Sequence, residues 1–146
     1  MPYYVGQFVM TWAKHERMLA DMLARVRGCE YEPLRDRFLD DQVAAYEKEM
    51  RKTLAEIGGA HPSAPYLQIV IDKHVSLRSI RHKIVHGFWL GIGPDDEYVL
   101  KRKPRKEEDT SRTLPLDEIE SAWQRLDALG CDVLNVGFAA QGKPII

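Results

Sequence analysis

The sequence VGQFVMTWAKHERMLADMLARV, residues 5–26, places apolar side chains at helical spacing along its length. The residues that follow this spacing are Val5, Phe8, Val9, Trp12, Leu19, Met22, Leu23 and Val26. Spacings of three and four put such residues on one face of an α-helix. The polar segment RGCEYEP, residues 27–33, ends the pattern. We therefore expect an amphipathic helix that packs one face against a helical core.

The same spacing returns in three further segments. These run from about Pro33 to Ile57, from about Pro65 to Ile84, and from Asp117 to about Ala140. Asp117 with Glu120 three residues later predicts a capping box at the start of the last helix. Three aromatic residues on the helical stripes are expected in the core: Trp12, Phe38 and Trp123.

The period of the pattern changes between the third and fourth expected helices. Residues 87–103, GFWLGIGPDDEYVLKRK, hold two short β-rich runs around GPDDE, which predicts a hairpin. Residues 104–113, PRKEEDTSRT, are polar and are expected to form a loop. A chain of 146 residues fits one domain. The expected fold is all-α: a four-helix bundle in one domain, residues 1–146, with a hairpin and loop at about 88–113 inserted before the last helix.

Composition narrows the class of protein. The formal net charge is −1, so binding to nucleic acid would require a local basic patch. Cys29 and Cys131 are far apart and form no Cys-x-x-Cys pair, which indicates free thiols in a reducing compartment. Residues 1–18 lack a basic leader and a long apolar run, so neither a signal peptide nor a membrane span is expected. We expect a cytoplasmic protein.

The segment RHKIVH, residues 81–86, concentrates cationic and titratable side chains at the end of the third helix. Arginine can hold a phosphate through two hydrogen bonds and stabilise added negative charge. Histidine can accept or donate a proton near neutral pH. Arg81 and His86 are about 140° apart around a helix, so they do not share a face. The arginine's long side chain could still converge with the histidine, especially across a two-fold axis. Together these groups suit cleavage of RNA by its own 2′-hydroxyl, with no metal or cofactor.

This Arg-x4-His at the end of a helix, in an all-α domain, resembles the signature of the HEPN superfamily. That signature is Arg-x4–6-His, often with a polar residue after the arginine, where His82 stands here. The resemblance implies an up-and-down bundle of four or five helices that forms a homodimer with a composite site between subunits. It also implies a metal-independent endoribonuclease of a toxin–antitoxin or other defence system. Arg81 and His86 would then be the catalytic pair, with His82 in support.

The resemblance bears on partners as well. Beyond RNA and a second copy, an antitoxin or a nucleotidyltransferase partner is implied. In one branch of the family the nucleotidyltransferase modifies a tyrosine two residues after the histidine. This chain has Phe88 at that position, so that form of regulation is not expected.

Glu16 stands out because it lies at the centre of the first helix's apolar stripe, seven residues from both Val9 and Leu23. A carboxylate buried there needs a partner. We expect Glu16 to face Arg81, or a neighbouring cation, and to fix its orientation. The alternative is that Glu16 reaches the rim of the helix or makes a purely structural ion pair.

Two groups of basic residues are candidates for RNA contact. His74, Arg78 and His82 recur at intervals of four and form a stripe that could line a groove for the RNA backbone or could be plain surface. Lys101, Arg102 and Lys103 begin the basic run KRKPRK, residues 101–106, near aromatic residues that suit single-stranded RNA. The pair His82 and His86 has zinc-like spacing, but HKIVH lacks the glutamate of His-Glu-x-x-His and no third ligand is evident, so no metal is expected.

Three other interpretations stay open. Arg81 and His86 could form a solvated helix end, where cations meet the helix dipole favourably. The protein could be a non-catalytic HEPN-like module that binds RNA or nucleotide, or a scaffold. It could also be a helical dimer whose groove serves assembly alone.

Overall fold

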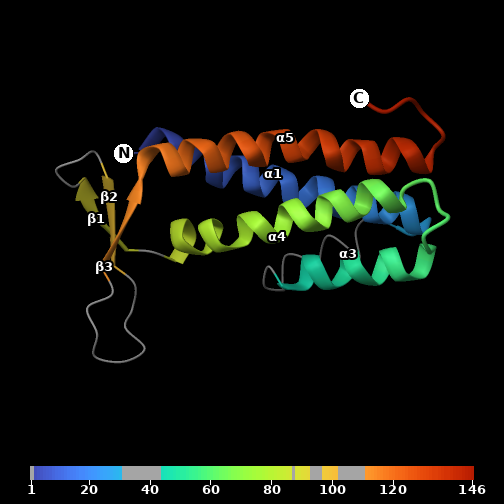
Figure 1. The fold of residues 1–146 in the computed structure, drawn as a ribbon, viewed down its shortest axis with the longest axis horizontal. Coiled ribbons are helices and arrows are strands. Elements are labelled where there is room, and N and C mark those ends of the chain that lie inside the picture. The colour runs from blue at the N-terminus through green and yellow to red at the C-terminus, as the bar shows by residue number, and fades with distance from the viewer. Residues whose placement is uncertain (1, 31–43, 87, 93–96, 102–110) are drawn as a thin grey trace.

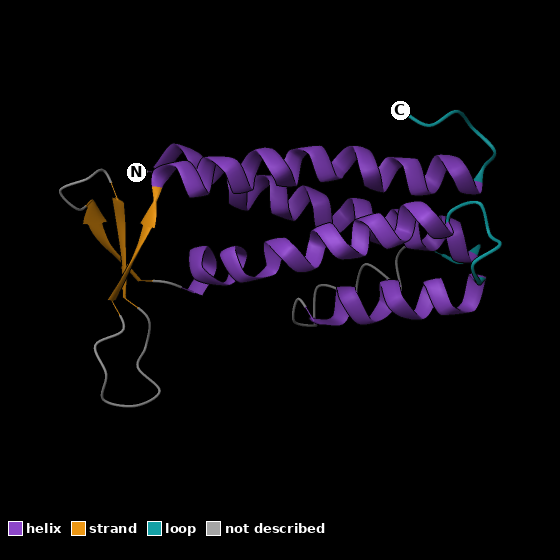
Figure 2. Ribbon diagram, viewed as in Figure 1, coloured by secondary structure: helices purple, strands orange, loops and turns teal. Residues whose placement is uncertain are grey.

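The computed structural model describes residues 2–30, 44–86, 88–92, 97–101 and 111–146. Within them lie four helices: α1 (Pro2–Arg27), α3 (Ala44–Ile57), α4 (Ala64–His86) and α5 (Leu116–Ala140). Three strands lie between α4 and α5: β1 (Phe88–Ile92), β2 (Glu97–Lys101) and β3 (Ser111–Pro115). The helices form an elongated bundle, and the small sheet lies at one end of it (Figures 1 and 2).

The core is built from the apolar faces that the sequence pattern predicts. α1 packs mainly against α5, α4 packs against both α5 and α3, and α3 also contacts α1. Large side chains buried from all four helices include Phe8, Leu19, Leu23, Met50, Leu67, Ile71, Leu77, Leu126 and Leu129. Burial of such side chains removes apolar area from water and is the main favourable contribution to the folding free energy. The described part of the chain is therefore mostly helical, as expected.

The helix bounds agree with the sequence pattern at α1, α4 and α5. Of the second expected helix, only α3 is described, and residues 33–43, with Phe38, lie outside the described residues. Trp12 is buried as expected, whereas Trp123 is half-buried and packs against the ring of Tyr4 at a centroid distance of 6.0 Å.

The expected alternation of helix directions can be followed in the three helices α3, α4 and α5. α3, α4 and α5 alternate, because the short segment 58–63 reverses the chain between α3 and α4 (Figure 1). Gly58 allows that reversal with a φ of 74°, a left-handed conformation that glycine adopts without strain, and its N–H donates to the carbonyl of Leu54. α1 and α3, however, run in the same direction. Residues 31–43, which lie between these two helices in the chain, are outside the described residues, so the up-and-down expectation is not tested there.

The insertion between α4 and α5 is a three-stranded antiparallel sheet in the order β1-β2-β3, not the expected two-stranded hairpin. β1 and β2 correspond to the two predicted strands, with an irregularity in register between Trp89 and Gly91. The expectation of a loop over residues 104–113 is wrong at its end, because β3 begins at Ser111 and pairs with β2. Leu114 on β3 is buried in the helical core, which fixes this strand to the bundle.

The capping box at the start of α5 is also absent. β3 runs directly into the helix, so Pro115 is the N-cap residue and makes no side-chain cap hydrogen bond. Asp117 lies inside the first turn instead, where its Oδ1 accepts from the backbone N–H of Glu118 at 3.0 Å. In the part of the chain that the structure describes, no helix is both long and apolar enough to cross a membrane.

Candidate functional site

Arg81 reaches from α4 onto α1. Its Nη2 lies 3.9 Å from Oε1 of Glu16, and its Cζ lies 5.3 Å from the ring centroid of Trp12, within the range of a cation–π contact. The Arg81 side chain is only 18% exposed. Its Nε is buried without a hydrogen-bond partner among the described residues. The guanidinium is therefore enclosed and oriented, yet within the described part of the chain no close ion pair holds it.

The contact expected between Glu16 and Arg81 is confirmed. Trp12 lies one turn before Glu16 on α1, so its indole Nε1 can donate to Oε1 of Glu16, at 2.8 Å. A hydrogen bond from Tyr46 of α3 also reaches this carboxylate. Burial raises the pKa of Glu16, and the hydrogen bond from Trp12, the charge of Arg81 and the hydrogen bond from Tyr46 offset part of that rise. Three helices thus meet at one carboxylate.

Tyr46 is a member of this site that the sequence analysis missed. It lies on the apolar face of α3 and is almost fully buried. Burial raises the pKa of its phenol, and so does the nearby charge of Glu16, so the hydroxyl keeps its proton and can donate. In the sequence Tyr46 is one more member of an apolar stripe, and only its pairing with Glu16 distinguishes it.

His74 is not an RNA-contacting residue in this structure. Its side chain is fully buried, and its Nδ1 lies 3.4 Å from Nε2 of His15 on α1. Burial, followed by the charges of Arg81 and Arg78, lowers the pKa of His74 to about 4. The expectation that His74 lines a surface groove is therefore wrong: α1 covers it, and it is neutral at pH 7.

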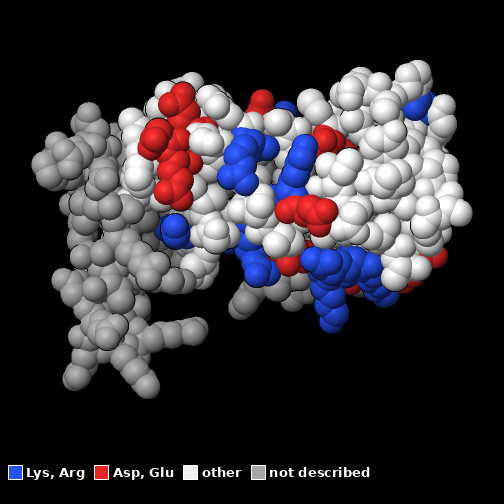
Figure 3. Space-filling model, viewed as in Figure 1, with Lys and Arg blue, Asp and Glu red and all other residues white. Residues whose placement is uncertain are grey.

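Some of the other proposed RNA contacts lie on the surface of the bundle, and the rest lie outside the described residues. Arg78 is 51% exposed and pairs with Glu47 of α3 at 3.0 Å, and His82 is exposed. Exposed basic side chains also lie on α3, and Figure 3 shows Lys and Arg over α3 and across the middle of the bundle, with acidic side chains among them. The side chain of Lys101, and the residues Arg102 and Lys103, lie outside what the structure describes.

His86 is the last residue of α4, so it follows Arg81 by about one and a half turns of the same helix. Its backbone is described and its side chain is not. The structure thus shows that the side chains of Arg81 and Glu16 lie together. For Arg81 and His86 it gives only the positions of their backbones on α4. In the described residues, no group of three or more His, Cys, Asp or Glu side chains is arranged to hold a metal ion.

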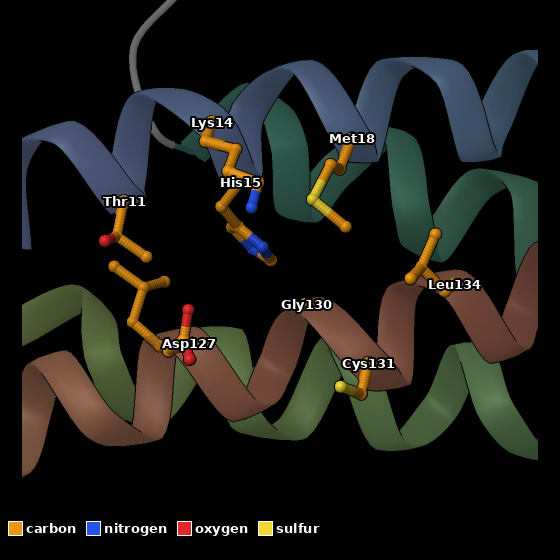
Figure 4. A pocket seen from close by; sticks show the side chains of 9 residues that line it. Thr11, Lys14, His15, Met18, Asp127, Gly130, Cys131 and Leu134 are labelled. Atoms are coloured by element: carbon orange, nitrogen blue, oxygen red, sulfur yellow. The ribbon is translucent and has the colours of Figure 1, made fainter. Parts of the chain in front are cut away.

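A separate small pocket of about 180 Å³ opens between α1 and α5 (Figure 4). Its wall includes His15, Lys14, Met18, Asp127 and Cys131. Nδ1 of His15 is itself inaccessible, although the side chain lines the pocket. This pocket therefore offers little polar contact to a ligand from the buried imidazole.

Comparisons with known proteins do not add to this description. No protein-family model matches the chain, and no curated protein or solved structure matches it either.

Proposed function

We propose that this protein is a HEPN-like, metal-independent endoribonuclease in which Arg81 binds the scissile phosphate and His86 transfers a proton. The observation that supports this most is the setting of Arg81, an enclosed cation that has no close ionic partner among the described residues. Arg78, one turn earlier on the same helix, makes an ordinary half-exposed ion pair at 3.0 Å. Burying a cation without a close partner is costly, and such arrangements are concentrated at functional sites.

In the proposed reaction the 2′-hydroxyl of RNA attacks the adjacent phosphorus, and the bond from phosphorus to the 5′-oxygen breaks. His86 takes the proton from the 2′-hydroxyl or returns one to the departing 5′-oxygen. Arg81 stabilises the extra negative charge of the pentacoordinate state, and His82 supports it. General acid–base catalysis of this kind contributes about 10²- to 10⁴-fold in rate. The products are a 2′,3′-cyclic phosphate and a 5′-hydroxyl end.

The proposal includes a homodimer with a composite site. Exposed apolar side chains on α1, namely Tyr3, Val9 and Met10, provide surface that a second copy could cover. As in the defence systems that the resemblance implies, an antitoxin or nucleotidyltransferase would be the protein partner. Toxicity on expression, relieved by changing Arg81, is then the expected result in cells.

A second candidate is a non-catalytic HEPN-like module that binds RNA or nucleotide. In this candidate, as in the enzyme, a phosphate has to compete with the contact between Arg81 and Glu16. Both candidates use Arg81 to bind phosphate, and they differ in whether a bond is broken.

Incubation of the purified protein with single-stranded RNA in the presence of a chelator separates them. The matched control is the double variant Arg81→Ala, His86→Ala, and the same sequence as DNA controls for the 2′-hydroxyl. Cleavage of RNA alone, by wild type alone, with cyclic phosphate ends supports the endoribonuclease. Binding that depends on Arg81 without cleavage supports the module. Equal cleavage by the double variant, or loss of cleavage in the chelator, contradicts the proposed enzyme.

A further inference from the structure

We propose that Trp12 is a positioning residue that keeps Arg81 available to phosphate, by supporting the guanidinium on its ring and holding Glu16 away with its N–H. This inference rests on the proposed function, in which Arg81 binds the phosphate of RNA. It concerns how the free protein holds an arginine next to a carboxylate without the two closing into a tight pair.

The distances show which donor holds the carboxylate of Glu16. Oε1 of Glu16 lies 2.8 Å from the indole nitrogen of Trp12 but 3.9 Å from Nη2 of Arg81. A charged N–H···O hydrogen bond is normally about 2.7–2.9 Å long. The neutral indole therefore has the close contact with this oxygen, and the cation has the distant one. Tyr46 adds a second neutral donor to the same carboxylate.

The ring of Trp12 supplies the support that a tight ion pair would otherwise give. Cζ of Arg81 lies 5.3 Å from the ring centroid, and arginine over an indole face is favourable without using its N–H donors. A bidentate pair with Glu16 would use two of those donors, which phosphate also requires. With the ring of Trp12 beneath it, Arg81 keeps its charge, and its N–H donors remain available to phosphate.

Trp12 is rigid enough for this task because it is only 4% exposed and contacts two other rings. Its ring stacks with Phe8 at a centroid distance of 5.9 Å and lies 5.2 Å from the ring of His74. Neighbours on α1 and α4 thus fix the indole, so its N–H and its face have set directions. A side chain locked in this way can hold a partner at small entropic cost.

The test is a double-mutant cycle on the affinity for a 2′-fluoro single-stranded oligonucleotide of mixed sequence, which lacks the attacking hydroxyl. Trp12→Phe keeps an aromatic face but removes the N–H, so Glu16 is free to close on Arg81. We expect this variant to bind about tenfold more weakly, the usual size of a lost hydrogen bond to a charged group. In a Glu16→Gln background the same change should have almost no effect, because no carboxylate remains to capture Arg81.

Tyr46→Phe provides a second route to the same result, since it removes the other neutral donor without changing the core volume. It should weaken binding less than Trp12→Phe does, and this loss should also vanish with Glu16→Gln. Trp123→Phe is the matched control for loss of an indole outside the site, and it should bind as wild type does. Circular dichroism and thermal midpoints establish that each variant is folded.

The outcomes distinguish this inference from the proposed function. If Arg81→Ala binds the oligonucleotide as tightly as wild type, the proposed function fails and the inference fails with it. If Arg81→Ala weakens binding but both Trp12→Phe and Tyr46→Phe bind as wild type, only the inference fails. A penalty from Trp12→Phe that is the same with Glu16 and with Gln at position 16 would show general loss of structure and would also overturn it.

Discussion

Nε2 of His15 on α1 lies 3.4 Å from Nδ1 of His74 on α4, with the two rings 25° from parallel in the core of the bundle. Burial and then His74 lower the pKa of His15 to about 3, while burial lowers that of His74 to about 4. Both rings are therefore neutral at pH 7, and one donates to the other. Their outer nitrogens, Nδ1 of His15 and Nε2 of His74, have no partner among the described residues.

This pair predicts that the protein loses stability in mild acid. The folded pKa values lie below the ordinary value of 6.5, so between about pH 4 and 6.5 the unfolded chain binds protons that the folded chain does not. The free energy of unfolding should therefore rise with pH across this window, by up to about 1.4 kcal/mol per pH unit for each histidine. Urea denaturation at several pH values measures this slope. The variant His15→Gln, His74→Gln should give a flatter profile, and an equally steep one would contradict the prediction.

The charge of Arg81 predicts an effect on the pKa of His74. Long side chains on a helix point back toward its N-terminus, which directs Arg81 toward the turn that carries His74. Arg81 is the largest charge that lowers the pKa of His74, second only to burial as a cause. Arg81→Met keeps the aliphatic stem and removes the charge, so the pKa of His74 should rise while staying below 6.5. Histidine ¹⁵N NMR titration measures it. An unchanged pKa of His74 in this variant would contradict the prediction.

Under the proposed function, Glu16→Gln should lower the rate of RNA cleavage about tenfold and leave the proposed dimer intact. The amide keeps the size of the side chain but loses the charge that faces Arg81, so we expect kcat to fall more than the affinity for RNA. Because the pKa of Glu16 is raised, wild-type activity should fall in acid at a higher pH than an ordinary glutamate would give, and this acid limb should be absent in the variant. Asp21→Asn, which changes a carboxylate on α1 that pairs with Arg25 instead, is the matched control. Unchanged cleavage by Glu16→Gln would rule out the role of Glu16.

The sequence predicted the partner of Glu16 because a carboxylate in the middle of an apolar stripe requires a cation, and RHKIVH provides one nearby. It did not predict the burial of His74. Along α4 the residues His74, Arg78 and His82 have identical spacing, so the pattern treats them alike. Only α1, which lies over the first of them and brings His15 to it, separates a core histidine from two exposed side chains. Burial of a polar residue depends on what another helix places opposite it.

The small sheet likewise contains one strand that the sequence did not predict. β1 and β2 have local signals, a turn sequence between two β-rich runs, and both were predicted. β3 has a polar sequence, and it becomes a strand because β2 offers an edge and Leu114 is buried under the helices. The sequence of a single segment does not reveal tertiary contacts of this kind.

The exposed stripe on α4 gives a final prediction about RNA affinity. Arg78 is half exposed and pairs with Glu47 of α3, so under the proposed function a phosphate of bound RNA can replace Glu47 as its partner. Arg78→Gln should weaken binding of single-stranded RNA to a similar extent for all sequences and reduce the slope of log affinity against log salt by about 1. Arg78→Lys keeps the charge and should retain most of the slope. Arg125→Gln, on the α5 side where Arg125 donates to Ser76, is the control that should leave the slope unchanged. A slope that is the same in Arg78→Gln and wild type would place the RNA on another face of the bundle.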